Sequence, residues 1–293
     1  MANPILPTNG THELQERYAQ AIVALKRKEN VVRNLFRKDY EGSPLSGAVK
    51  IPTRNTEVVV GDYDVAAGGT LGTGATTYTT VTISKNQYVN ELIDGYEANA
   101  VPDNIIAQRL DSAAYSMGRT QELYAIGKLE ATTSVETSTA LLTTSTAYGA
   151  IVNSIATLKK LGININDIKV VVSVDTEATL YQDVKFSNSA GVLGAELIRQ
   201  GVIGKIVGAE VYTSANLTQE GVVEDDVNVE YVVFSPLWAQ TVEEWMVMPS
   251  IQDLKDGKHI GASALQGRMV YEDSLLDVTT CRKKTYVVPE EEE

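Results

Sequence analysis

Cysteine and histidine are scarce in this sequence, with one cysteine and two histidines among 293 residues. A single cysteine forms no disulfide within the chain and excludes a zinc site built from several cysteines. Two histidines leave little material for metal binding or for proton transfer near neutral pH. Cys281 lies beside Arg282, but neither His12 nor His259 is near it in the sequence, so we expect an inert thiol.

Positive charge is also limited, since 25 Lys and Arg face 38 Asp and Glu, a net charge of -13. Proteins that read duplex nucleic acid present a basic face to the phosphates, so this balance argues against that class. No apolar run approaches the roughly 18 residues that a membrane-spanning helix needs. Residues 1–10 contain no apolar segment of a signal peptide. We therefore expect a chain made in the cytoplasm, without a membrane partner.

Two segments match part of a phosphate-binding or catalytic motif, and neither match is complete. A phosphate loop ending at Gly204-Lys205 would need a glycine where Arg199 stands and a hydroxyl where Ile206 stands. The segment Gly261–Leu265 fails the last position of the G-x-S-x-G pattern. The composition is otherwise that of a folded protein, with 43% hydrophobic and 22% charged residues. The sequence thus predicts a folded chain that is not an enzyme and has no catalytic, cofactor or metal site.

A basic amphipathic segment, Glu13–Lys38, is predicted to form a helix. It holds seven basic and three acidic residues, a net charge of +4, which leaves -17 for the rest of the chain. One interpretation is a solvated helix packed on its own domain. The other is an arm that contacts an oppositely charged neighbour through its apolar stripe and its arginines. The residues expected in those contacts are Leu14, Ile22, Leu25, Leu35, Arg27 and Arg33.

A long glycine-tipped hairpin is predicted next, after a linker at Glu41–Pro52. Its strands are expected at Glu57–Val65 and Thr76–Val89, around an uncharged tip with Gly68, Gly69, Gly72 and Gly74. The flanks are rich in threonine and poor in large apolar side chains, and an isolated two-stranded ribbon is marginal in water. We expect such a ribbon to become ordered against another surface, and the tip glycines are candidate assembly contacts. A surface hairpin of a sandwich domain is the alternative.

The remaining chain predicts one long helix, a compact α/β lobe and a closing sheet. The long helix is expected at Val101–Glu130, and Ala131–Ser145 is left open between strand and loop. The lobe is expected to contain helices at Tyr148–Leu161, Asp175–Asp183 (capped by Asp175) and Leu193–Gln200, with strands at Ile168–Val174, Lys205–Ser214 and Glu230–Phe234. The closing sheet is expected to use Thr241–Met248, Ala264–Glu272 and Leu276–Val288.

This order of elements resembles the major capsid proteins of tailed bacteriophages, whose fold is shared by bacterial encapsulin shell proteins. The resemblance rests on the order of elements, because the family has no sharp sequence motif. It implies an α+β capsid fold divided into four parts. These are an N-terminal arm at 1–54, an extended loop at 55–90, a peripheral domain with a long spine helix at 91–145 and 238–293, and an inserted axial domain at 146–237.

The resemblance also implies binding partners and a location in the virion. The chain would assemble with itself as hexamers and pentamers into an icosahedral head shell around double-stranded DNA, and would be part of the virion. Since no long extension precedes the arm, the resemblance implies either a separate scaffolding protein or prior cleavage, and the start Met1-Ala2-Asn3 favours the scaffolding protein. A portal and a decoration protein are further implied partners. Some relatives join a loop lysine covalently to a neighbour's asparagine, but Lys85 is the only lysine between Ile51 and Gly127. We therefore expect a shell without covalent cross-links.

Three other functions fit the sequence less well. An encapsulin shell would enclose cargo enzymes, and the chain itself carries no feature that separates it from a phage shell. An α/β enzyme would need a phosphate loop or clustered histidines and carboxylates. A tail or surface structural protein would differ in the shape of the particle it forms.

Overall fold

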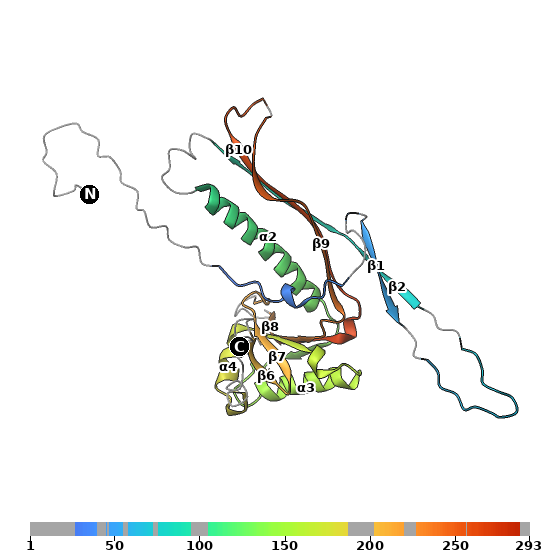
Figure 1. The fold of residues 1–293 in the computed structure, drawn as a ribbon. Helices are drawn as coiled ribbons and strands as arrows, with labels where there is room; N and C mark the ends of the chain where they lie inside the picture. The colour runs from blue at the N-terminus through green and yellow to red at the C-terminus, as the bar shows by residue number, and fades with distance from the viewer. Residues whose placement is uncertain are drawn as a thin grey trace, which may run out of the picture.

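The structure, a computed structural model, has the predicted α+β composition. It describes residues 27–39, 45, 47–54, 58–72, 76–94, 105–186, 202–219, 227–255 and 257–287. Figure 1 shows a compact lobe from which a long helix and a long sheet extend side by side, while a loop projects away from both. The expected helix Leu193–Gln200 lies outside the described residues, as do Leu14, Ile22, Leu25 and Gly74.

A six-stranded sheet forms the lobe, in the order β4-β11-β8-β5-β7-β6. The strands are β4 (Val135–Ser138), β5 (Lys169–Val172), β6 (Val202–Ile206), β7 (Ala209–Thr213), β8 (Val227–Phe234) and β11 (Cys281–Val287). Helix α3 (Ala147–Lys160) buries Ile151, Ile155 and Leu158 against this sheet, and α4 (Val174–Tyr181) adds Leu180. The predicted α3 and β5 are thereby confirmed, and the segment left open contains β4.

Two local predictions in the lobe are corrected by turn and cap chemistry. Ser173, rather than Asp175, caps α4, because its hydroxyl oxygen accepts the Thr176 N–H. The single strand expected at Lys205–Ser214 is part of the hairpin β6–β7. Val207 and Gly208 both have positive φ, 51° and 96°, as a two-residue hairpin turn of this hand requires.

Helix α2 (Ile105–Glu130) confirms the predicted spine helix and covers one face of a three-stranded antiparallel sheet. That sheet has the order β3-β10-β9, formed by β3 (Lys85–Ile93), β9 (Ala239–Asp253) and β10 (Ser263–Leu275). Leu265 and Met269 of β10 pack with Ala113 and Met117 of the helix. The helix and the sheet thus bury one long shared seam (Figure 1).

The third C-terminal strand lies in a different sheet from the one predicted. Leu276–Val288 was expected to close the sheet over α2 together with β9 and β10. Instead β11 pairs with β8 and β4 in the lobe, and the 3-10 turn η4 (Val278–Thr280) separates it from β10. The apolar alternation of a strand does not specify its partner, which explains the error.

The predicted hairpin is also rearranged. The strand expected at Glu57–Val65 is wrong, because the described residues 58–65 form only an isolated bridge between Asp64 and Gly68. The strand pair is instead formed by β1 (Ala48–Arg54), placed where a linker was predicted, and β2 (Thr76–Thr82). The second predicted strand breaks at Ile83–Ser84, so that β2 and β3 belong to different sheets.

The described part of the basic segment, residues 27–39, is extended apart from the 3-10 turn η1 (Arg33–Leu35). The predicted helix is therefore wrong over residues 27–38. Its backbone N–H groups at Val31, Val32 and Arg33 bind a carboxylate of α2 instead of carbonyls of their own chain. After its first turn, an α-helix uses its backbone N–H groups for hydrogen bonds to its own carbonyls. Because these three N–H groups bind a side chain of α2, they are not in the interior of the predicted helix.

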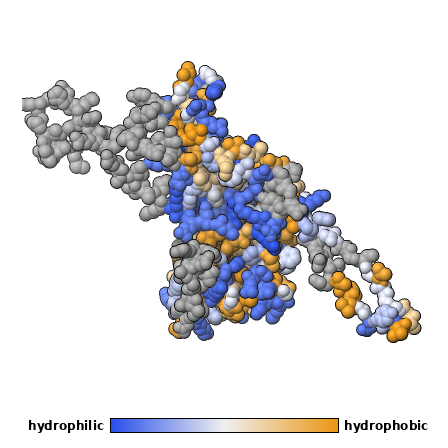
Figure 2. All heavy atoms as spheres, in the orientation of Figure 1, coloured by the Kyte–Doolittle hydropathy of each residue, from blue (hydrophilic) through white to orange (hydrophobic). Residues whose placement is uncertain are grey.

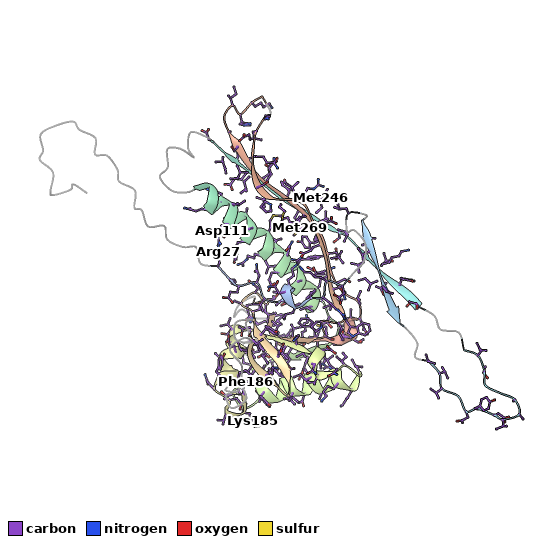
Figure 3. All side chains as sticks on the ribbon, viewed as in Figure 1. Arg27, Asp111, Lys185, Phe186, Met246 and Met269 are labelled. Atoms are coloured by element: carbon purple, nitrogen blue, oxygen red, sulfur yellow. The ribbon has the colours of Figure 1, made fainter. Side chains whose placement is uncertain are left out.

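Replacing Gly204 with alanine is expected to destabilise the lobe. A Cβ atom there would overlap the ring of Phe186, which lies fully buried against the glycine (Figure 3). Overpacking of this kind costs about 1–3 kcal/mol. Urea unfolding of Gly204→Ala should show this loss, whereas Gly149→Ala in α3, where nothing lies within 4 Å, should be neutral or slightly stabilising. Equal midpoints for both variants would contradict this account of the core.

Candidate assembly surfaces

The arm, defined here as residues 27–39, runs along α2 before it enters the core. Arg27 forms an ion pair with Asp111 at 2.6 Å and lies over the Tyr115 ring (Figure 3). The Tyr115 hydroxyl accepts the Lys28 N–H at 2.9 Å. Asn30 lies against Gly118, where a Cβ atom would approach its side chain to 3.3 Å. The small residue of the helix thus admits the arm.

A buried carboxylate then holds the arm by its backbone. Glu122 is fully buried, and its two oxygens accept the N–H groups of Val31, Val32 and Arg33 at 2.9, 2.8 and 2.9 Å. Hydrogen bonds to a charged acceptor are stronger than neutral ones, and their net value is about 1.5–3 kcal/mol each. These contacts fix the main chain of the arm without using its side chains.

Beyond Glu122 the arm is part of the hydrophobic core. Val32 and Phe36 are buried with Ala125 and Leu129 of α2, and the Phe36 ring lies 5.9 Å from that of Phe234. Leu35, which was expected to contact other subunits, packs partly buried against this same cluster. The described end of the arm is therefore bound to its own subunit, and its basic charge is neutralised largely within the chain.

Arg33 occupies a polar centre between the arm, α2 and the sheet. Its guanidinium donates to Gln121 of α2, to the Thr241 hydroxyl and to Glu243 of β9. Lys38 also pairs with Glu243. Although burial opposes it, these two cations hold the pKa of Glu243 below its ordinary value, so this carboxylate is charged at neutral pH.

Asp273 of β10 faces the same centre from a fully buried position. In the described structure neither of its carboxylate oxygens accepts a hydrogen bond, and its nearest cationic atom is Arg33 Nε at 3.9 Å. Burial raises the pKa of Asp273 to about 6, against the lowering effects of the nearby Thr241 side chain and of Arg33. This carboxyl group therefore changes charge close to neutral pH.

The base of the extended loop is joined to α2 by a second carboxylate. Glu272 of β10 accepts hydrogen bonds from the Tyr124 hydroxyl at 2.7 Å and from Lys128 at 2.8 Å. It also accepts the Ser84 N–H at 3.1 Å, where β2 passes into β3. Lys85 lies over the Tyr124 ring, with its Nζ atom 4.7 Å from the centroid. The loop therefore begins from a fixed point on the body.

The loop itself exposes apolar side chains. Val58, Val59 and Val60 are 88–92% exposed, and Leu71 is 96% exposed. Figure 2 shows hydrophobic residues on the projecting loop, away from the body. Near its end Asp64 accepts the Ala66 and Ala67 N–H groups, and Gly68, with a φ of 75°, donates to the Asp64 carbonyl at 2.8 Å. Glycine suits that backbone, which an L side chain rarely adopts.

Metal binding, membrane insertion and thiol reactivity have little support among the described residues. Within the described ranges no three His, Cys, Asp or Glu residues come together as a metal site. None of the described helices is both long and apolar enough to cross a membrane. Cys281 is buried, which raises the pKa of its thiol to about 12. This agrees with the inert thiol expected from the sequence.

The family model for phage capsid proteins matches residues 96–271, which is more than half of the chain. The chain belongs to the phage capsid protein family. It is a structural subunit of a phage capsid and a component of the virion. The matched range holds the spine helix, most of the lobe and the paired strands β9 and β10.

Solved structures share the fold of this capsid protein over nearly its whole length. A chain from Mycobacterium phage Che8 is 18% identical, with a TM-score of 0.71, over 94% of this chain and 98% of that one. The capsid of cyanophage P-SCSP1u is 12% identical, with a TM-score of 0.67 over 93% and 92%. The mature capsid of bacteriophage PhiM1 is 14% identical, with a TM-score of 0.66 over 93% and 91%. No curated protein sequence matches significantly.

The structure brings some of the predicted contact residues together and separates others. Arg27 and Arg33 lie on the same arm and pair with their own subunit, whereas Gly68, Gly69 and Gly72 belong to the segment 58–72 of the loop that projects from the body (Figure 1). A role for any of them between subunits stays a prediction. The sequence did not predict roles for Glu122, Glu272 and Asp273, because an acidic residue in a helix or strand is ordinarily solvated.

Replacing Asp273 with asparagine should flatten the pH dependence of subunit stability. The folded-state pKa of about 6 exceeds the ordinary 3.8, so the stability that Asp273 contributes is full below pH 4 and lost as the pH rises through 6. The shift corresponds to about 3 kcal/mol. Asp273→Asn should gain up to that amount over the wild type between pH 4.5 and 7.5 in urea unfolding, whereas the exposed Asp111→Asn should not. A difference that does not change with pH would contradict the shifted pKa.

Proposed function

We propose that this capsid protein assembles with itself, as hexamers and pentamers, into an icosahedral head shell that encloses double-stranded DNA. The observation that carries the proposal is the loop with its exposed valines. An apolar strip of this kind has unfavourable contact with water and is stabilised when another surface covers it. Other copies of the chain supply such a surface at every position of a shell. The protein acts as a wall and catalyses no reaction.

We further propose the division into an arm, an extended loop, a peripheral domain and an axial domain. The long seam between α2 and the sheet of β3, β10 and β9 supports the peripheral domain. The six-stranded lobe supports the axial domain, and the hydrogen bonds that join β4 and β11 to this sheet favour including these two strands. The boundary proposed at 145/146 would then move back to the start of β4, and β11 would be a separate C-terminal segment of the axial domain, after β9 and β10.

A separate scaffolding protein, a portal and a decoration protein are proposed partners, with assembly in the host cytoplasm. The net charge of -13 supports a wall that does not adhere to packed DNA, since like charges repel. DNA would thus be enclosed without sequence-specific binding.

The experiment is to express the chain, with the phage's scaffolding protein, and to image the products by electron microscopy. Closed shells are expected from the wild type and from Val59→Ile. Val59→Ser should lose most closed particles, because burying one valine side chain is worth about 1.5–3 kcal/mol and the loss recurs in every subunit. At 91% exposure this change should leave the melting temperature of the subunit unchanged.

Either of two results would overturn the proposal. The first is a chain that stays monomeric at high concentration with scaffold present. The second is a Val59→Ser variant that assembles as well as the wild type. Particles filled with enzymes instead of DNA would favour the encapsulin alternative.

Mature shells should also lack covalent links between subunits. Lys85 is the only lysine between residues 51 and 127, and it lies over Tyr124 of its own chain at the base of the loop. A link of this kind needs the lysine within contact distance of a neighbour's amide. Shells boiled in detergent should run as a single 31.7 kDa band. A ladder of multiples that survives reduction would contradict this prediction.

A further inference from the structure

The arm is held with unequal strength on the two sides of Glu122. Toward the C-terminus, Val32 and Phe36 are buried, and Arg37 exchanges two backbone hydrogen bonds of 2.9 Å with Ala239 and Thr241 of β9. Toward the N-terminus, the ion pair of Arg27 with Asp111 is solvent-exposed, with side-chain exposures of 29% and 68%. Exposed pairs of this kind contribute about 0–1 kcal/mol. Between these two sides, the buried carboxylate of Glu122 accepts three consecutive main-chain N–H groups of the arm. N-terminal to it, neutral groups hold the main chain: the Tyr115 hydroxyl bonds to Lys28, and the Asn216 amide donates to the Glu29 carbonyl at 2.9 Å.

The contact also determines the direction of the main chain. Three consecutive N–H groups converge on one carboxylate, which restricts the backbone angles at Val31, Val32 and Arg33 together. Every described hydrogen bond of Glu122 is to the backbone, so the contact does not depend on which side chains the arm carries there. This carboxylate therefore fixes the orientation of the arm's main chain at residues 31–33.

We infer that Glu122 is a positioning residue for assembly, which sets the direction in which the arm leaves its own subunit. The inference rests on the proposed assembly into shells. In a closed shell each arm must extend toward a particular neighbouring subunit. If its direction is wrong at the point of attachment, the displacement of the arm increases with distance along it. Glu122 thus acts through the arm, with no contact of its own to another subunit.

Glu130 provides a matched control on the same helix. Its carboxylate accepts the Thr218 N–H at 2.9 Å and the Thr218 hydroxyl, so it also binds a backbone donor, but in the lobe instead of the arm. Glutamine at either position keeps the size of the side chain and replaces one acceptor oxygen with a donor. At position 122 that donor would face an N–H group, so at least one of the three hydrogen bonds is lost.

The first measurement is hydrogen exchange on the isolated subunits. Glu122→Gln should raise the exchange rates of the Val31, Val32 and Arg33 amides at least tenfold. Glu130→Gln should leave these amides protected and instead raise the exchange of the Thr218 amide. Unchanged exchange at Val31–Arg33 in Glu122→Gln would overturn the inference, because the carboxylate would then not hold the arm.

The second measurement is assembly of the same proteins with the scaffolding protein. Glu122→Gln should form open or irregular particles, with closed shells reduced at least tenfold, while Glu130→Gln closes as the wild type does. A purely structural role would make both variants equally defective, or neither. If Glu122→Gln is unfolded, the same two measurements are made on Glu122→Asp, whose carboxylate is shorter by one methylene and lies further from the arm.

The outcomes separate this inference from the proposed function. Wild-type shells together with normal closure of Glu122→Gln would refute the positioning role and leave the shell intact as a proposal. A wild type that never closes would refute the shell, while the exchange measurement would still test the contact between Glu122 and the arm.

Discussion

The polar side chains of α2 are the feature on which the rest of the structure depends. Glu122 binds the main chain of the arm, Tyr124 and Lys128 bind Glu272 of β10, and Glu130 binds Thr218 of the lobe. Removing a carboxylate from water costs several kcal/mol, so each buried one must be matched by donors in a fixed position. Because the matching donors lie on different segments, one helix holds the arm, the sheet and the lobe in a single arrangement.

The hydrophobic contacts of α2 change along its axis, from the sheet at its first turns to the arm and the lobe at its last turns. Ala113 packs near the outer end of the sheet, Met117 packs at its middle, and Ala125 and Leu129 enter the cluster shared with the arm and the lobe. The helix therefore supports the sheet with its first turns and the junction with the lobe with its last. Because α2 lies where the arm, the sheet and the lobe meet, the residues that touch it come from distant parts of the sequence, near positions 30, 90, 218 and 270.

The sequence predicted the elements whose apolar pattern is regular. Helix α2, helix α3 and the cores of β9 and β10 were found because their buried faces recur at the period of a helix or a strand. The arm was mistaken for a helix because Val32, Leu35 and Phe36 are spaced like a helical stripe. In the structure, that spacing belongs to a single 3-10 turn inserted into a core. Glu122 could not be identified, since a glutamate in a helix is ordinarily a solvated residue.

Strand partners were harder to predict than strands. Val58, Val59 and Val60 have the composition of a buried strand, yet they lie exposed beyond the end of β1. Within the described chain β2 pairs with residues 48–54 instead, which leaves the valines without a cross-strand neighbour. A β-branched run kept outside the core is unfavourable for an isolated subunit, because it gains neither burial nor ladder hydrogen bonds. The proposed packing of this run against other copies of the chain would account for its presence, because the unit that must be stable would then be the shell.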